Sequence, residues 1–255
     1  MPAPYIGITD FTSYGQVRSM IRVLEGFRSL NNFHQLHAGV MMSYKTLNGL
    51  ETKWSKAFPP KERVSEIFSS SLSMNCLHYA DYDGIDVYEN LSKAIRYGGP
   101  GMNALQLDMV WPDPDEVRIA TLNSCKRLDV ILQVGKNAFD VVGNDPSKVV
   151  ERIGNYKNFI SYVLLDKSMG RGLGLDANGL VPYIREIKKA FPDLGIAVAG
   201  GLGPESLGLV EPLVKEFPDL SIDAQGRLRP SGSALDPIDW DMAKTYLIKA
   251  LIMFQ

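Results

Sequence analysis

Two glycine-containing segments near the end of the chain have the composition of an anion-binding site. Residues 195–205 read GIAVAGGLGPE, so an apolar run ends in two glycines, and a proline follows where a helix would begin. Residues 220–226 read LSIDAQG and end in a similar way. Glycines at such places let backbone N–H groups approach a phosphate, and a helix N-terminus adds partial positive charge. The predicted phosphate-binding residues are Gly200, Gly201, Gln225, Gly226 and Arg227.

The histidines and cysteines are few and poorly spaced for a metal site or a disulfide framework. His34 and His37 have an odd spacing, which puts their side chains on opposite faces of a strand. Cys76 and His78 would share one face of a strand and could form an activated thiolate, although a buried core cysteine is the commoner arrangement. We therefore expect no metal and no cofactor, and two cysteines fit a reducing compartment.

The overall composition is typical of a soluble globular protein with enough apolar residues for a sizeable core. The 255 residues carry 27 Lys and Arg against 29 Asp and Glu, a net charge of −2, and 45% are hydrophobic. No long basic run supports nucleic acid as a partner, and no window of about 18 apolar residues could span a membrane. The start of the chain does not read as a secretory signal, so we expect a cytoplasmic protein. The expected partner is a small phosphorylated substrate, and a homodimer stays open.

The chain that must position these residues alternates short apolar runs with helical patterns. The runs that read as strands are 5–9, 33–40, 75–80, 103–109, 129–135, 159–166, 195–199 and 220–224. Their starts run from 5 to 220, so the seven intervals average about 31 residues, the size of one strand-and-helix unit. The sequence therefore predicts eight such units in succession.

The segments between the runs predict helices that cover the strands. Apolar residues recur with helical spacing in 180–191. Asp145-Pro146 and Asp236-Pro237 each read as an N-cap followed by proline at the first helical position. A helix beside every strand indicates that the strands are buried and parallel.

Eight successive units without a compositional break favour one closed (β/α)8 barrel, a TIM barrel, as a single domain over residues 1–255. Residues 41–60 and 225–235 are longer than the connections need, so we expect extended loops after strands 2 and 8. Both would lie on the face where barrel active sites are found. An open doubly wound sheet is the main alternative, but no Gly-x-Gly-x-x-Gly follows the first strand.

Five short motifs follow one another at the ends of the predicted strands. They are IGIT at 6–9, LQLD at 105–108, LLD followed by GRGLGLD within 164–176, AGGLGPE at 199–205 and IDAQG at 222–226. In this order they resemble the phosphoribosylanthranilate isomerase family. The resemblance covers most of the chain and is strongest over residues 162–226.

The resemblance implies an aldose–ketose isomerase that performs an Amadori rearrangement of a phosphoribosyl amine. Such a reaction needs a general acid at the ring oxygen and a general base at carbon 2. Asp166 corresponds to the family's acid, whereas Ile6 stands where the family has its basic cysteine, so the base is unidentified. Asp108 replaces a family histidine, and Lys45 is a further substrate- or phosphate-binding candidate, in the loop where the family has an arginine. Asp10 shares the strand parity of Ile6 and is a third catalytic candidate, unless it caps the following helix.

Two other functions stay open at this point. A Schiff-base aldolase or lyase on the same barrel would use Lys136 after strand 5 as its amine. Lys167 is a poorer candidate because it is adjacent to Asp166 and so points to the opposite side. A non-catalytic barrel would keep the phosphate loops without a base.

Overall fold

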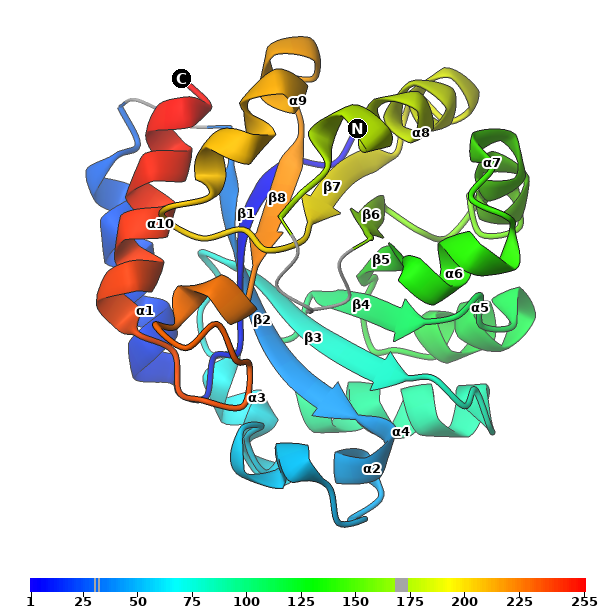
Figure 1. The fold of residues 1–255 in the computed structure, drawn as a ribbon. Helices are drawn as coiled ribbons and strands as arrows, with labels where there is room; N and C mark the ends of the chain where they lie inside the picture. Colours follow the sequence, from blue (N-terminus) through cyan, green and yellow to red (C-terminus); the bar gives the residue numbers. More distant parts are fainter. Residues whose placement is uncertain (30, 32, 168–173) are drawn as a thin grey trace.

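Eight parallel strands close into one barrel in the computed structural model (Figure 1). The structure describes residues 1–29, 31, 33–167 and 174–255. Each strand pairs with its neighbours in chain order, and β8 pairs with β1 to close the ring. The strands are β1 Tyr5–Thr9, β2 Gln35–Ser43, β3 Met74–Asp81, β4 Ala104–Met109, β5 Asp129–Gly135, β6 Tyr162–Asp166, β7 Gly195–Ala199 and β8 Ser221–Ala224. The predicted (β/α)8 barrel is confirmed.

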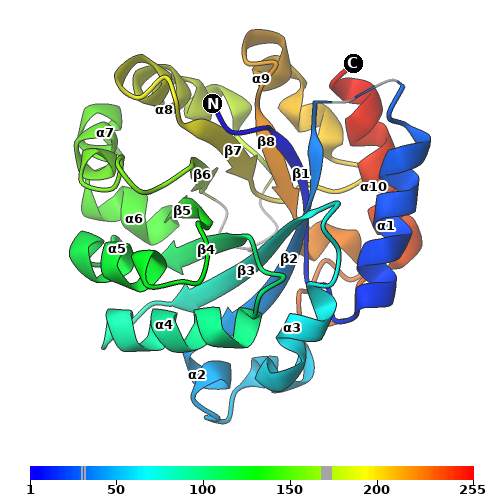
Figure 2. The ribbon, with the colours of Figure 1, turned by 180° about the vertical axis from the view of Figure 1, so that it is seen from behind.

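Helices form an outer ring around the strands (Figures 1 and 2). The α-helices are α1 Tyr14–Gly26, α2 Tyr44–Leu47, α3 Val64–Ile67, α4 Val87–Gly98, α5 Pro114–Leu122, α6 Lys136–Val141, α7 Pro146–Gly154, α8 Ala177–Ala190, α9 Glu211–Glu216 and α10 Trp240–Met253. The short 3-10 helices are η1 Lys53–Lys56, η2 Lys61–Arg63, η3 Leu207–Val210 and η4 Gly226–Leu228. The last helix, α10, packs beside α1, so the two ends of the chain complete the ring together.

One of the two predicted helix starts is confirmed and the other is wrong. Asp145 caps α7 by accepting the backbone N–H of Ser147 at 2.8 Å. The last helix begins at Trp240 rather than after Asp236, because the Asp239 side chain accepts two backbone N–H groups of the first turn at 3.0 Å each.

The interior of the barrel is apolar at the amino ends of the strands and polar at their carboxyl ends. The apolar interior cluster consists of Tyr5, Met74, Cys76, Ala104, Ile131, Tyr162, Leu164 and Ala197. Because side chains alternate along a strand, the next interior residue of each strand lies two positions later. On β3 to β6 these next residues are His78, Gln106, Gln133 and Asp166. The polar layer of the interior therefore lies directly above the apolar cluster, toward the carboxyl ends of the strands.

Cys76, His37 and His34 pack within the fold, and none of them lines the cavity at the carboxyl ends of the strands. Cys76 is fully buried, and burial raises the pKa of its thiol well above the ordinary value, so it is a core cysteine and not an activated thiolate. His37 stacks on Tyr5 inside the barrel with ring centroids 4.7 Å apart. His34 instead contacts Phe254 outside the barrel, at 4.1 Å, as the odd spacing predicts.

The second strand is longer than the sequence suggested. β2 extends to Ser43, so Met41 and Met42 belong to the strand and not to the loop. The remaining long connection folds into α2 and the 3-10 helices η1 and η2. None of the described helices has the length and apolar character needed to cross a membrane.

Candidate active site

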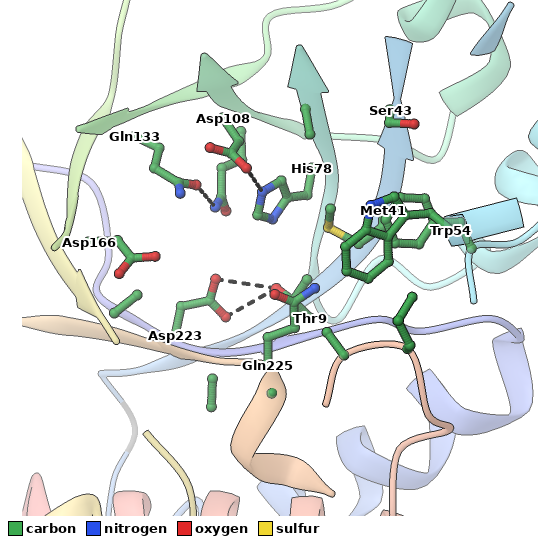
Figure 3. A pocket seen from close by; sticks show the side chains of 18 of the residues that line it. Thr9, Met41, Ser43, Trp54, His78, Asp108, Gln133, Asp166, Asp223 and Gln225 are labelled. Carbon is green, nitrogen blue, oxygen red and sulfur yellow. Dashed lines mark hydrogen bonds and ion pairs between the residues drawn. The ribbon is translucent and has the colours of Figure 1, made fainter. Parts of the chain in front are cut away.

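A cavity of about 970 Å³ opens at the carboxyl ends of the strands. Its walls include both extended connections: Trp54 and Phe58 come from the one after β2, and Ser233 and Leu235 from the one after β8. Figure 3 shows the carboxylates of Asp166 and Asp223, with the ring of His78 nearby, directed at the same central space. This is the face of the barrel on which the two loops were expected.

Asp223 is a buried carboxylate at the centre of the site. It lies on β8 and is 6% exposed, and Thr9 donates its hydroxyl to both carboxylate oxygens at 3.2 Å. Burial is the main effect on this group and raises the pKa of Asp223 to about 6, although His78 and the Thr9 hydroxyl oppose the rise. A carboxyl group with a pKa near neutrality is suited to general acid–base catalysis.

Two strand glycines make room for this arrangement. A Cβ at Gly7 would lie 2.5 Å from an oxygen of Asp223, and a Cβ at Gly39 would lie 2.5 Å from the Thr9 hydroxyl. Both contacts are shorter than van der Waals distance, so neither position accepts a side chain without moving the catalytic candidates. Gly7 therefore faces the interior.

The same alternation decides where Ile6, the position aligned with the family's cysteine, lies on β1. Ile6 is adjacent to Gly7 and must point the other way, into the fully buried core beneath the helices. The position that corresponds to the family's basic cysteine thus does not reach the cavity. The β1 side chain that does line it is Thr9.

His78 and Asp108 form a second polar group on β3 and β4. His78 Nε2 lies 3.6 Å from Asp108 Oδ2, and the Tyr82 hydroxyl donates to that same oxygen at 2.7 Å. Burial lowers the pKa of His78, but Asp108, Asp223 and Asp10 outweigh it and leave the pKa raised above its ordinary value. Among the described residues, neither ring nitrogen has a hydrogen-bond partner.

Two glutamines form the floor beside this histidine. Gln106 donates its Nε2 to Gln133 Oε1 at 2.8 Å. The Gln106 Oε1 is buried, and no described residue donates to it. A buried acceptor without a partner is costly, so this oxygen is suited to receive a hydroxyl or water in the cavity.

The predicted phosphate residues meet at one side of the cavity. Gly200, Gly201, Gln225, Gly226 and Arg227 all line it. Gly200 has φ 127° and Gly201 has φ 61°, which L side chains rarely adopt, so both positions require glycine.

The two phosphate loops also pack against each other. A Cβ at Gly203 would lie 2.6 Å from the Arg227 carbonyl oxygen. The helix expected at Pro204 does not begin there, because the chain turns first and η3 starts at Leu207. The Gly-rich segment after β6 lies mostly in residues 168–173, outside the described residues.

Asp10 does not line the cavity, and it does not cap the following helix. Arg229 donates to its carboxylate at 2.5 Å in a buried ion pair, and Gln225 donates to the other oxygen at 3.2 Å. Ser13, not Asp10, is the N-cap of α1. Arg229 also donates to the Gln225 carbonyl at 2.7 Å, so the pair fixes the loop after β8 to the end of β1.

The lysines divide between the cavity and the helices. Lys45 lines the cavity, as does Lys53. Lys136 instead pairs with Asp140 along α6, and the Lys167 ammonium lies 4.4 Å from the centre of the Tyr183 ring. Neither Lys136 nor Lys167 is among the residues that line the cavity, so the Schiff-base assignment has no amine in the place where it was expected.

The sequence analysis missed several residues that the barrel brings to the mouth: Thr9, Gln106, Gln133, Asp223 and Trp54. A usable signal existed for two of them. In LQLD, Gln106 has the same strand parity as Asp108, and Asp223 lies within IDAQG two residues before Gln225. Trp54 stacks on Phe58, with ring centroids 5.3 Å apart and planes 10° from parallel, which only the folded loop reveals.

No family model matches the chain, and no curated protein sequence is similar to it. Several solved structures share the fold. Active domain 2 of a thermostable chitinase from Pyrococcus furiosus, complexed with chito-oligosaccharides, has 14% identity and a TM-score of 0.50, covering 98% of this chain and 96% of that chain. Phosphonopyruvate hydrolase has 15% identity and a TM-score of 0.43, covering 84% of this chain and 79% of that chain.

A mandelate racemase/muconate lactonizing enzyme-type protein from Sorangium cellulosum has 11% identity and a TM-score of 0.43. The match covers 87% of this chain and 53% of that one, so this chain spans about half the length of that protein. At such identities the comparisons show the barrel fold alone. The proteins that share it here are enzymes of different chemistries, as is usual for this fold.

Proposed function

We propose that this protein is an isomerase of phosphorylated, sugar-type small molecules that works by proton transfer at the mouth of the barrel. The observation that carries the proposal is the pairing of Asp223 and Asp166 in one cavity with the glycine loops. The glycines would hold the phosphate, and the carboxyl groups would act on the carbons beyond it. The ordered resemblance to phosphoribosylanthranilate isomerase supports the same substrate class.

In this proposal Asp166 is the general acid and Asp223 the general base. Asp166 protonates the ring oxygen as its bond to carbon 1 breaks. A lone pair of the carbon-1 substituent forms the new double bond, which is C=N for a phosphoribosyl amine and C=O, with loss of the hydroxyl proton, for an aldose phosphate. Asp223 takes the proton from carbon 2, and the electron pair of that C–H bond forms the C1=C2 double bond of the enol. Asp223 then returns its proton to carbon 1 and Asp166 takes back the proton of the carbon-2 hydroxyl, which leaves a carbonyl on carbon 2 and an amine or a reprotonated hydroxyl on carbon 1, so no atom is gained or lost.

The environment of each carboxyl group suits its role. With a pKa of about 6, Asp223 is mostly ionised at neutral pH and still basic enough to accept a proton. Asp166 is half-buried at the end of β6, and its charge adds to the rise in the pKa of Asp223. One protonated and one ionised carboxyl group is the state that the reaction needs.

The proposal is tested by turnover and by binding. Purified protein is offered phosphoribosylanthranilate and ribose 5-phosphate in D₂O, and deuterium in the product is measured by mass spectrometry. We expect isomerisation with solvent deuterium in the product. We also expect Asp223→Asn and Asp166→Asn each to lower kcat by about 10²- to 10⁴-fold.

Asp193→Asn, an exposed aspartate outside the cavity, is the matched control and should behave as the native protein. Calorimetry with ribose 5-phosphate and with ribose separates binding from chemistry. Binding of the phosphate ester without any turnover or exchange would identify a non-catalytic barrel. No binding of either phosphate ester would contradict the proposal.

A further inference from the structure

Tyr82, Asp108 and His78 form a chain of polar contacts at the cavity. Tyr82 follows β3 and donates its hydroxyl to Asp108 Oδ2 at 2.7 Å, and the same oxygen lies 3.6 Å from His78 Nε2. Asp108 and His78 both line the cavity, and Figure 3 shows the contact between them. The proposed acid and base do not use any of the three residues.

We propose that His78 is a further catalytic residue, an imidazolium that stabilises negative charge on a substrate oxygen, with Asp108 and Tyr82 as positioning residues. This inference rests on the proposed function, because removal of the carbon-2 proton from the open-chain aldehyde of an aldose phosphate leaves negative charge on the oxygen of carbon 1. A preorganised cation beside that oxygen lowers the barrier more than one that must be recruited from solvent.

The charges around His78 favour the imidazolium. The groups facing it are Asp108 from β4, Asp223 from β8, Asp10 from the end of β1 and His37 from β2. The three aspartates are acidic, and His37 stays neutral because burial, its main influence, lowers its pKa to about 3. These neighbours therefore stabilise a positive charge at His78.

The hydrogen bonds of the site leave His78 available for a ligand. His78 is only 6% exposed, and among the described residues its Nδ1 has no partner, whereas its Nε2 faces Asp108 at 3.6 Å, beyond hydrogen-bond distance. A buried donor without a partner is costly, so a ligand oxygen in the cavity is its natural acceptor. The neighbouring Gln106 Oε1 has an unused acceptor, which complements a hydroxyl on the same ligand.

Tyr82 lines the outer part of the same cavity, and its contact toward His78 runs through Asp108. Its hydroxyl holds one carboxylate oxygen in the orientation that faces the imidazole. The Tyr82 side chain is largely exposed, so replacing it with phenylalanine removes the hydroxyl without opening a cavity. This makes Tyr82→Phe the variant that separates positioning from folding.

The charge of His78 is measured by NMR titration of the histidine ring signals in the full chain. The chain has three histidines, and His34 and His37 have lowered pKa values, both chiefly because of burial. We expect a single histidine to titrate above the ordinary midpoint of about 6.5. His78→Gln should remove that signal and identify it, and Asp108→Asn should lower its midpoint to about 6.5 or below.

Kinetics of the same variants test the catalytic role. We expect His78→Gln to lower kcat for ribose 5-phosphate about 10²-fold and Tyr82→Phe to lower it about tenfold with little change in KM. Tyr14→Phe, a tyrosine on α1 outside the cavity, is the matched control. A His78 that titrates at or below 6.5 in an active protein overturns the inference and leaves the proposed function intact.

Equal kinetics for Tyr82→Phe and Tyr14→Phe would also overturn the inference, because the chain of polar contacts would then have no effect. A raised titration midpoint in a protein that turns over no sugar phosphate would overturn the proposed function and the catalytic role with it. The two failures are therefore distinguishable.

Discussion

The protein buries two carboxylates near the paired ends of β1 and β8, and their surroundings differ. Asp10 and Asp223 are both 6% exposed. Asp10 is held by the Arg229 guanidinium at 2.5 Å and by Gln225 at 3.2 Å. Asp223 accepts the Thr9 hydroxyl at 3.2 Å, the one side-chain donor to it among the described residues, and it faces the cavity.

The difference shows how partners decide the role of a buried carboxylate. Burial raises the pKa of Asp10 as well, against the opposing effects of Arg229 and Gln225. These two partners hold the carboxylate in place away from the cavity, so it serves to fasten two loops together. Among the described residues no guanidinium pairs directly with Asp223, and burial raises the pKa of this carboxyl group to about 6, although the nearby His78 opposes the rise. A carboxyl group whose burial is left partly uncompensated can exchange protons near neutral pH.

The largest expected effect comes from removing the cation of the first pair. Arg229→Met leaves Asp10 buried without its partner, which should lower the free energy of unfolding by about 3 to 5 kcal/mol. Urea denaturation measures the change. Lys249→Met, which breaks the exposed pair with Glu205, should cost about 1 kcal/mol or less. Equal losses in the two variants would show that the Asp10 pair has no special structural role.

The role of Asp223 is tested by adding a side-chain atom next to its carboxylate. Gly7→Ala places a Cβ 2.5 Å from the Asp223 carboxylate and should displace it, which we expect to lower kcat about 10²-fold. Gly26→Ala, where no atom lies within 4 Å of the added Cβ, is the matched control and should keep full activity. Unchanged kinetics in Gly7→Ala would mean that the position of Asp223 does not matter for the reaction.

The raised pKa of Asp223 also predicts a pH dependence of stability. In the unfolded chain this aspartate loses its proton near pH 3.9, whereas in the folded protein it does so at about 6. The folded state therefore binds the extra proton between these values, and its stability falls as pH rises through this window. Asp223→Asn removes that dependence.

We expect Asp223→Asn to be more stable than the native protein at pH 7, by roughly 1 to 3 kcal/mol, and the difference to vanish near pH 4. Urea denaturation of both proteins at several pH values measures it. A constant difference across this range would show that the pKa of Asp223 is not raised.

The smallest expected effect lies at the rim, away from both carboxylates. Trp54 is half-buried, stacks on Phe58 and has the Lys53 ammonium 5.0 Å from its ring centre. Trp54→Ala should raise KM up to about tenfold with little change in kcat, because the ring packs against the ligand and does not react. Phe33→Ala, at an exposed position outside the cavity, should leave KM unchanged.

The sequence predicted the barrel and its glycine loops because both follow from local patterns. Strand and helix periods alternate along the chain, and Gly200-Gly201 marks a backbone turn that only glycine accepts readily. The ends of the strands were predicted less well, and β2 extends three residues beyond its predicted end, to Ser43. Met41 and Met42 are apolar and buried, but apolar residues occur in strands and in buried loops, so the sequence does not mark where this strand ends.

The sequence could not identify which residues of β1 face the cavity. All five residues of YIGIT are buried, so polarity does not reveal the two faces of the strand. Alignment with the family pointed to Ile6, but Gly7 faces Asp223 and Ile6 faces the helices. The partner of Asp10 was hidden for a different reason, because Arg229 is more than two hundred residues away in the chain.

The most direct test of the central claim is a crystal structure of Asp223→Asn soaked with ribose 5-phosphate. The account predicts the phosphate against Gly200, Gly201 and Gly226, with the sugar carbons extending toward positions 166 and 223. A phosphate bound at the opposite rim, near Lys45 and Lys53, with the sugar away from Asp166, would contradict it.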